Sequence, residues 1–405
     1  MKPTTFREIS GDSTGFWALL GLLGLLIAAG LGAAWYMEHN GHWVTGMNNQ
    51  IVWGMPHVFA VFLIVAASGA LNVASMASVF GRTALKPLSR LSGLLAIALL
   101  AGGLMVLVLD LGHPDRLIMA MMNLNFMSIF AWNIILYNGF FLIVGIYLWT
   151  MMEKRANRHT KTAGLFAFVW RLILTTGTGS IFGWLVARQA YDAAIMAPMF
   201  IALSFSFGLA IFMLVLFASY RWAGRPLGDY MIVRMQRLLG LFVIAALFFV
   251  VVYHLTNLYA AEHRSVEHFM LDGDNVYSGL FWVGYVLLGS LIPMAIAWFG
   301  PFRASLGWAT TAAALVVAGG LAMMYVIIIG GQAYPLQLFP GKEVSSSFFD
   351  GVVNPYSPTL AETLLGIGGV GIALAIVVVG IRLLKFLPLS LEDARVDPHY
   401  KADEA

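Results

Sequence analysis

The chain has 405 residues, of which 60% are hydrophobic and 11% are charged, with a net charge of +3 and no cysteine. Together with a mean hydropathy of +0.83, this composition excludes a soluble protein and indicates a polytopic membrane protein. The lack of cysteine excludes disulfides, thiolate-ligated iron–sulfur clusters and covalently attached c-type haem.

Ten apolar segments are long enough to cross a bilayer as helices. The first is too long for a typical signal-peptide core, so we expect it to be retained. The segments cover residues 16–37, 51–80, 91–109, 128–152, 163–187, 195–220, 238–258, 277–299, 306–330 and 360–384. The predicted fold is an all-α integral membrane protein whose single polytopic domain covers residues 1–405.

Lysine and arginine are unevenly distributed along the chain. Eighteen of the 23 lie in the two terminal segments and the even-numbered connections, four lie in the odd-numbered connections, and Arg171 lies inside the fifth span. By the positive-inside rule, both termini, including the tail 385–405, are predicted to be cytoplasmic. The predicted location is the bacterial inner membrane, with the odd-numbered connections on the periplasmic side. The long connection 331–359 is one of these and is expected to help a partner dock.

Short similarities suggest an internal repeat. Pro56 in span two corresponds to Pro198 in span six, and Arg90 and Arg237 open spans three and seven. This alignment predicts that residues 16–152 and 163–299 form two related four-helix bundles, with extra helices over residues 306–384.

Polar side chains gather near the predicted periplasmic ends of the spans. Oxidation of a quinol needs acceptors for two hydroxyl groups, a base and an apolar wall for the ring, and histidine and half-buried carboxylates suit the proton transfer. The residues predicted to bind a quinone or transfer its protons are His57, Asp110, His113, Arg116, Trp132, Asn133, Tyr137, His254 and Glu362.

Each of these residues also has a simpler interpretation. Asp110 and Arg116 would form an ion pair that closes a loop, and Glu362 would favour the first turn of its own helix. His57 and His254 lie at similar depths, so a haem b with these two axial ligands is an alternative. An ion-translocating transporter is a further alternative, but it needs a polar path across the bilayer, and only Arg171 lies deeper. That arginine either snorkels to the cytoplasmic surface or lines an inner proton path.

Three motifs carry a family resemblance: Trp53-Gly-Met-Pro56, Asp110-Leu-Gly-His-Pro-Asp-Arg116 and Ser128-Ile-Phe-Ala-Trp132. They resemble the NrfD/polysulfide-reductase membrane-subunit family over nearly the whole chain. The family motif Asp-Leu-Gly-x-Pro-x-Arg begins at Asp110, and His113 stands where other members commonly have arginine. The segments 37–42 and 354–358, with Glu362, resemble the DsrP branch of the Dsr sulfur-metabolism complex.

The resemblance implies a quinone-reactive membrane anchor that uses menaquinone or ubiquinone and is not a complete enzyme alone. It would exchange electrons between the quinone pool and a periplasmic ferredoxin-like iron–sulfur subunit in a sulfur-metabolising respiratory complex. A cytochrome c subunit and a second membrane subunit are the other expected partners. No nucleic acid is expected to bind.

Overall fold

A computed structural model describes residues 4–336 and 351–400. Within these residues, ten helical segments are long and apolar enough to cross a membrane, which confirms the predicted number of spans. The first seven contain α1 (Thr14–Asn40), α2 (Met55–Ala70) with α3 (Asn72–Ser78), η2 (Thr83–Leu88) with α4 (Ser89–Leu109), α6 (Ile129–Met152), η4 (Asn157–His159) with α7 (Thr160–Gly183), α8 (Met196–Trp222) and α9 (Asp229–Tyr259).

The last three spans include two segments of π-helix. Span eight joins α11 (Val276–Gly279), the π-helix η5 (Leu280–Leu291) and α12 (Ile292–Trp298), and span nine joins α13 (Leu306–Tyr325), the π-helix η7 (Val326–Gly330) and α14 (Gly331–Ala333). Span ten is α15 (Leu360–Leu383). The connections contain the short helices η1 (His42–Val44), η3 (Pro114–Arg116), α5 (Leu117–Met122), α10 (Arg264–Leu271), η6 (Gly300–Phe302) and α16 (Asp393–Val396).

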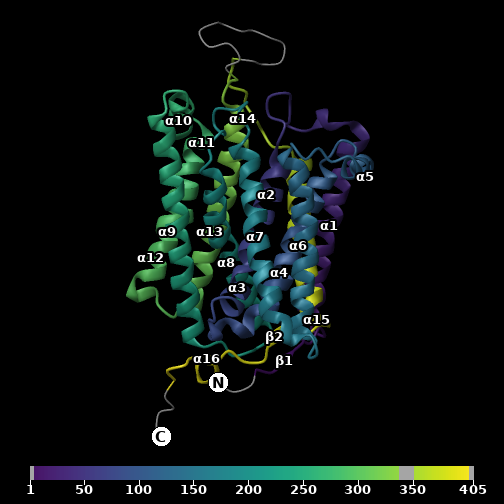
Figure 1. The fold of residues 1–405 in the computed structure, drawn as a ribbon, viewed down its shortest axis with the longest axis vertical. Coiled ribbons are helices and arrows are strands. Elements are labelled where there is room, and N and C mark those ends of the chain that lie inside the picture. The colour runs from purple at the N-terminus through teal and green to yellow at the C-terminus, as the bar shows by residue number, and fades with distance from the viewer. Residues whose placement is uncertain (1–3, 337–350, 401–405) are drawn as a thin grey trace.

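Both ends of the chain lie at the same end of the helix bundle (Figure 1). There β1 (Phe6–Arg7) pairs antiparallel with β2 (Leu387–Pro388). We call this the proximal end; the opposite, distal end carries α5, α10 and α14 (Figure 1). The expected docking connection 331–359 falls partly outside the described residues, and the tail 385–405 is described as far as residue 400.

The centre of the bundle is the crossing of α2 and α8. The apolar window of the α2–α3 span is wholly buried, and α2 packs mainly against α4, α8 and α15. A Cβ at Gly69 would overlap the Ser204 carbonyl oxygen, and a Cβ at Gly208 would overlap the Ala70 nitrogen. The two backbones therefore touch, which only glycine permits here.

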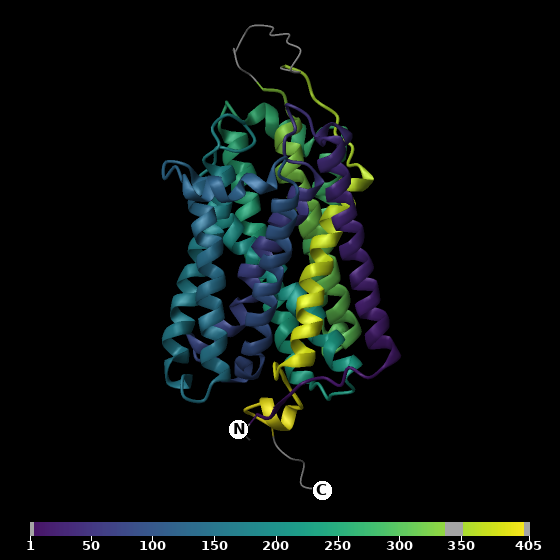
Figure 2. The same ribbon diagram turned by 90° about the vertical axis from the view of Figure 1, so that its right-hand side faces the viewer.

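The predicted grouping of the first four spans in one bundle is wrong for the first span. Helix α1 packs chiefly along α15, the last span, as the adjacent purple and yellow helices in Figure 2 show. A Cβ at Gly30 would lie 2.8 Å from the Gly368 Cα atom, so the glycines of both helices allow close approach. The middle helices instead pack as α2 with α4, α6 with α7 and α8 with α9 and α13. The sequence repeat of 16–152 and 163–299 stays a prediction.

Candidate functional site

A cavity of about 500 Å³ lies between α2, α4, α6 and α7. Most of its wall is apolar, and a volume of this size is usual for a small-molecule site. Four of the predicted residues line it: His57, Asp110, Asn133 and Tyr137. The apolar and aromatic lining residues include Trp53, Val61, Ile64, Leu104, Leu107, Phe130, Ile134, Ile181, Phe182 and Ile328.

His57 and Asp110 meet at the distal side of this cavity. His57 lies in the first turn of α2 and Asp110 is the C-terminal cap of α4, so both helices end at the distal level and bring the side chains together. The His57 Nδ1 atom lies 3.0 Å from Asp110 Oδ2, and the Asp110 side chain is only 1% exposed. The predicted alternative, an ion pair of Asp110 with Arg116, is not what the structure shows, because Arg116 is exposed on η3.

The Asp110 carboxylate is poorly satisfied. The ring of His57 is close to it but not aligned for a hydrogen bond, and within the described chain neither carboxylate oxygen has a hydrogen-bond donor. A buried carboxylate without donors is costly, so such a group is usually completed by water or a ligand. A hydroxyl group in the cavity would satisfy Asp110.

A second free acceptor lies on α6. The Asn133 amide donates to the carbonyl oxygens of Ile129 at 2.9 Å and Gly177 at 3.1 Å. Those bonds fix the amide, and its Oδ1 atom is buried with no donor among residues 4–336 and 351–400. Tyr137 lies one helical turn further on and also lines the cavity. Two residues of the cavity lining, Asp110 on α4 and Asn133 on α6, therefore carry buried acceptor atoms that have no donor in the described part of the chain.

Aromatic rings form one wall of the cavity. The Trp53 indole lies 6.2 Å from the His57 ring and is nearly parallel to it, and its ring meets Phe182 edge-on at 5.7 Å. Phe130 of α6 meets the same indole at 6.3 Å. A flat apolar ring is a natural occupant of such a wall.

Three predicted residues do not line the cavity: His113 and Arg116 on the connection between α4 and α6, and Trp132 in the first turn of α6. His113 pairs with Asp115 at 3.6 Å, and both side chains are mostly exposed. The Trp132 indole is half-exposed and donates to the Phe126 carbonyl oxygen at 2.9 Å. All three residues lie near the distal end, but their exposed side chains are not part of the cavity lining.

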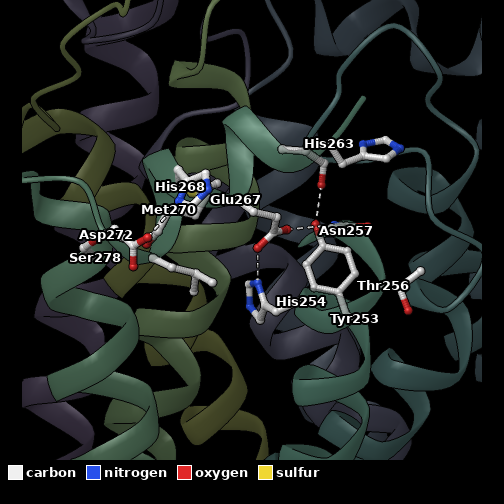
Figure 3. Close-up of polar contacts among 12 residues, drawn as sticks. Tyr253, His254, Thr256, Asn257, His263, Glu267, His268, Met270, Asp272 and Ser278 are labelled. Atoms are coloured by element: carbon white, nitrogen blue, oxygen red, sulfur yellow. Dashed lines mark hydrogen bonds and ion pairs between the residues drawn. The ribbon is translucent and has the colours of Figure 1, made fainter. Parts of the chain in front are cut away.

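His254 belongs to a separate buried cluster, shown in Figure 3. Its Nδ1 atom lies 2.6 Å from Glu267 Oε2, and Asn257 donates to Glu267 Oε1 at 2.8 Å. Glu267 comes from α10 and is 1% exposed. The helices that carry His57 and His254, α2 and α9, both pack against α8, and the Nδ1 atom of each imidazole faces its own carboxylate. A haem b between these two histidines stays an alternative from the sequence.

Glu362 is also buried away from the cavity. It accepts hydrogen bonds from the Tyr356 hydroxyl at 2.6 Å, the Gly46 amide at 2.9 Å, and both the amide and the hydroxyl of Thr359. Thr359 and Glu362 form a capping box at the start of α15. Burial, followed by the hydrogen bond to Glu362, raises the pKa of Tyr356, so this phenol stays protonated as a donor.

Arg171 does not snorkel to the surface. Its side chain is fully buried and donates to Asn72 Oδ1 at 2.9 Å and to the Ser68 carbonyl oxygen. Both partners lie on the α2–α3 span, and the rings of Phe168 and Phe205 are within 5.1 Å of the guanidinium carbon. Arg171 therefore links α7 to the α2–α3 span by hydrogen bonds.

Two buried polar residues are not among those predicted for the site. Gln332 is 2% exposed and bonds to the backbone around Trp53. Glu267 lies in the connection between α9 and α11, where Val266, Glu267 and Met270 form the buried face of α10. The amphipathic spacing within 264–271 was the available signal for Glu267.

Two larger cavities lie near the proximal end. One has a volume of about 820 Å³ and the other about 660 Å³. Basic side chains line both, including Arg82, Arg234, Arg237 and Arg303 in the first and Lys86, Arg90, Arg158 and Lys161 in the second, and three aspartates, Asp229, Asp393 and Asp397, also line the first. Charged walls of this kind suit a solvated surface better than a neutral apolar ring.

Comparison with known proteins agrees with the motifs. A family model described as Polysulphide reductase, NrfD matches residues 43–335. The "Hdr-like menaquinol oxidoreductase integral membrane subunit" of Archaeoglobus fulgidus is 30% identical, covering 95% of this chain and 96% of that protein. A putative dimethyl sulfoxide reductase membrane subunit of Halobacterium salinarum is 26% identical, with 95% and 93% covered.

A third relative, a selenate reductase subunit of Mesobacillus selenatarsenatis, is 24% identical over 91% of this chain and 92% of that protein. All three relatives are named as subunits of reductases or oxidoreductases. The family match covers more than half of the chain and includes the loops and helices that build the distal cavity. The chain belongs to the polysulphide reductase, NrfD family of membrane subunits.

Proposed function

We propose that the chain is the quinone-reactive membrane subunit of an oxidoreductase complex, and that the distal cavity holds the quinone head group. The observation that carries the proposal is the buried Asp110 carboxylate, which faces an aromatic cavity beside His57 and has no donor in the described chain. A quinol hydroxyl would supply that donor, and the apolar wall would hold the ring.

Asp110, His57 and Asn133 would have separate roles in binding the quinol and removing its protons. When bound, a quinol would supply two electrons, which pass to the partner iron–sulfur subunit, and two protons. Asp110 would accept a hydrogen bond from one hydroxyl and then take its proton, and His57 would receive that proton and release it to water. Asn133 Oδ1 would accept a hydrogen bond from the second hydroxyl and orient the ring, and the second proton would leave through Asp110 and His57 after the first. Trp53 and Phe182 exclude water from the ring face.

The name of the Archaeoglobus relative supports menaquinone rather than ubiquinone as the quinone. The finer assignment, a DsrP-like subunit of a sulfur-metabolising complex, rests on the segments 37–42 and 354–358. Its partners would be a periplasmic ferredoxin-like iron–sulfur subunit, a cytochrome c subunit and a second membrane subunit. An exposed apolar group beside the cavity, Ile118, Met119, Met122, Phe126 and Met127, supports docking of a partner at the distal end.

The proposed orientation puts the proximal end in the cytoplasm and the distal cavity on the periplasmic side of the inner membrane. The basic residues of the even-numbered connections lie with the termini, as the positive-inside rule requires. Protons removed at Asp110 would then leave to the periplasm.

Replacing Asp110 by asparagine tests the proposal. The change keeps the shape of the side chain and removes the base, so quinol oxidation by membranes that contain the complex should fall by about a hundredfold, the usual scale for a general base. Asp115→Asn is the matched control, because Asp115 is 74% exposed and lies outside the cavity. Equal turnover in both variants would refute the role of Asp110.

A further inference from the structure

The segment that enters α2 carries two residues of the cavity, Trp53 and His57. Gly54 is the N-terminal cap of α2 and supplies no side-chain cap. The position of this segment therefore depends on groups from elsewhere in the chain. Side chains from the ends of spans nine and ten provide them.

Gln332, just after η7, holds the backbone of Trp53 from both sides. Its Oε1 atom accepts from the amides of Val52 at 2.9 Å and Trp53 at 3.0 Å. Its Nε2 atom donates to the carbonyl oxygens of Trp53 at 3.0 Å and Ile328 at 2.7 Å. All four hydrogen-bonding sites of the amide are used. The side-chain amide thus makes hydrogen bonds to both the N–H and the C=O of Trp53. Only one orientation of the amide satisfies these partners.

Tyr356 and Glu362 replace the missing cap of α2. The Tyr356 hydroxyl accepts from the Met55 amide at 2.7 Å and donates to Glu362 at 2.6 Å. A carboxylate behind this hydroxyl complements the positive end of the helix. The packing is tight, because a Cβ at Gly54 would overlap Glu362 and lie 2.7 Å from the Tyr356 oxygen.

We propose that Gln332 and the Tyr356–Glu362 pair are positioning residues that set where the Trp53 indole and the His57 imidazole stand in the cavity. This rests on the proposed function and changes the role of Glu362 from a quinone contact to a support of α2. Since reacting groups must be held within a fraction of an ångström, a shift of this segment would weaken both binding and turnover.

Equilibrium binding of a short-chain menaquinone analogue to the purified full chain tests the proposal. Quenching of tryptophan fluorescence would report the Kd. Gln332→Leu and Glu362→Gln should each raise the Kd about tenfold and lower quinol turnover in membranes that contain the complex. Gln236→Leu and Glu267→Gln are matched controls, because Gln236 and Glu267 are equally buried but contact other parts of the chain. Both controls should keep the wild-type Kd even where they lower the Tm.

Two further variants separate a positioning role from a purely structural one, because a loss of stability alone would not produce their expected effects on the Kd. Gln332→Glu places a carboxylate oxygen against the carbonyls of Trp53 and Ile328, and protonation restores one donor. Its Kd relative to wild type should therefore recover as the pH is lowered. Tyr356→Phe removes the cap of Met55 together with the hydrogen bond to Glu362 and should also raise the Kd, which keeps the test valid if Gln332→Leu fails to fold.

The outcomes separate this inference from the proposed function. If the wild type binds the analogue, Asp110→Asn lowers turnover as predicted, and the Gln332, Tyr356 and Glu362 variants bind like wild type, the positioning role is refuted and the cavity assignment stands. If the wild type itself does not bind the analogue, the proposed function fails.

Discussion

At the scale of single residues, the contacts of His57 indicate a role in proton transfer as well as in forming the cavity wall. Its ring contacts both the Asp110 carboxylate and the Trp53 indole, and its side chain is 23% exposed against 1% for Asp110. A proton accepted by the buried carboxylate can therefore reach the more accessible imidazole. Imidazole suits this task because a proton can be taken up at one ring nitrogen and given up at the other.

Replacing His57 by leucine should remove this exit for the proton. We expect quinol turnover to fall at least about tenfold while binding of the quinone analogue changes little, because the apolar wall remains. Steady-state kinetics in membranes containing the complex would separate kcat from KM. His113→Leu is the control, since His113 is exposed outside the cavity. A rise in KM with no change in kcat would show that His57 only binds the ring.

The sequence could predict part of this site and not the rest. Residue type and depth in the membrane were sufficient for His57, Asp110, Asn133 and Tyr137, which share one cavity. The same criteria selected His254 and Glu362, which lie in other buried clusters. Depth fixes the level of a side chain but not which helices surround it, and that is decided by packing between spans distant in sequence.

At the scale of the elements, contact between glycine-rich helix faces decides the arrangement. Helices α2 and α8 meet at Gly69 and Gly208, and α1 meets α15 at Gly30 and Gly368. The number of spans follows from hydropathy, so the ten spans were predictable from the sequence. The choice of partners was not, because every span is apolar on all sides and glycine occurs in nearly all of them.

The contact of α2 with α8 gives a stability prediction. Gly208→Ala introduces a Cβ atom that overlaps the Ala70 nitrogen, so the central helices must separate. The cost should be about 1–3 kcal/mol, seen as a lower Tm of the purified protein in detergent. Gly145→Ala is the control, because a Cβ there meets nothing within 4 Å. The idea of a closely packed centre would be wrong if both variants melted like wild type.

At the scale of the whole molecule, the distribution of charge predicts the orientation in the membrane. The chain has no cysteine, so single cysteines can be introduced without a background reaction. Asp272 lies at the distal end next to α10, and Arg158 lies in the connection before α7 at the proximal end; both are exposed.

In right-side-out vesicles, a membrane-impermeant maleimide should label a cysteine at position 272 and leave one at position 158 unlabelled until the membrane is permeabilised. This outcome follows from the excess of lysine and arginine in the even-numbered connections. The reverse labelling would put the cavity on the cytoplasmic side and invert the proposed release of protons.

The central claim is that the distal cavity, rather than a proximal one, binds the quinone head group. Photoaffinity labelling with an azido-menaquinone analogue, followed by peptide mapping, tests it most directly. If the distal cavity binds the quinone, the label should be found on peptides from 53–64, 104–117 and 130–138. It should be lost when an unlabelled menaquinone analogue competes. Competed label on the proximal residues 229–241 instead, or label that no quinone displaces, would contradict it.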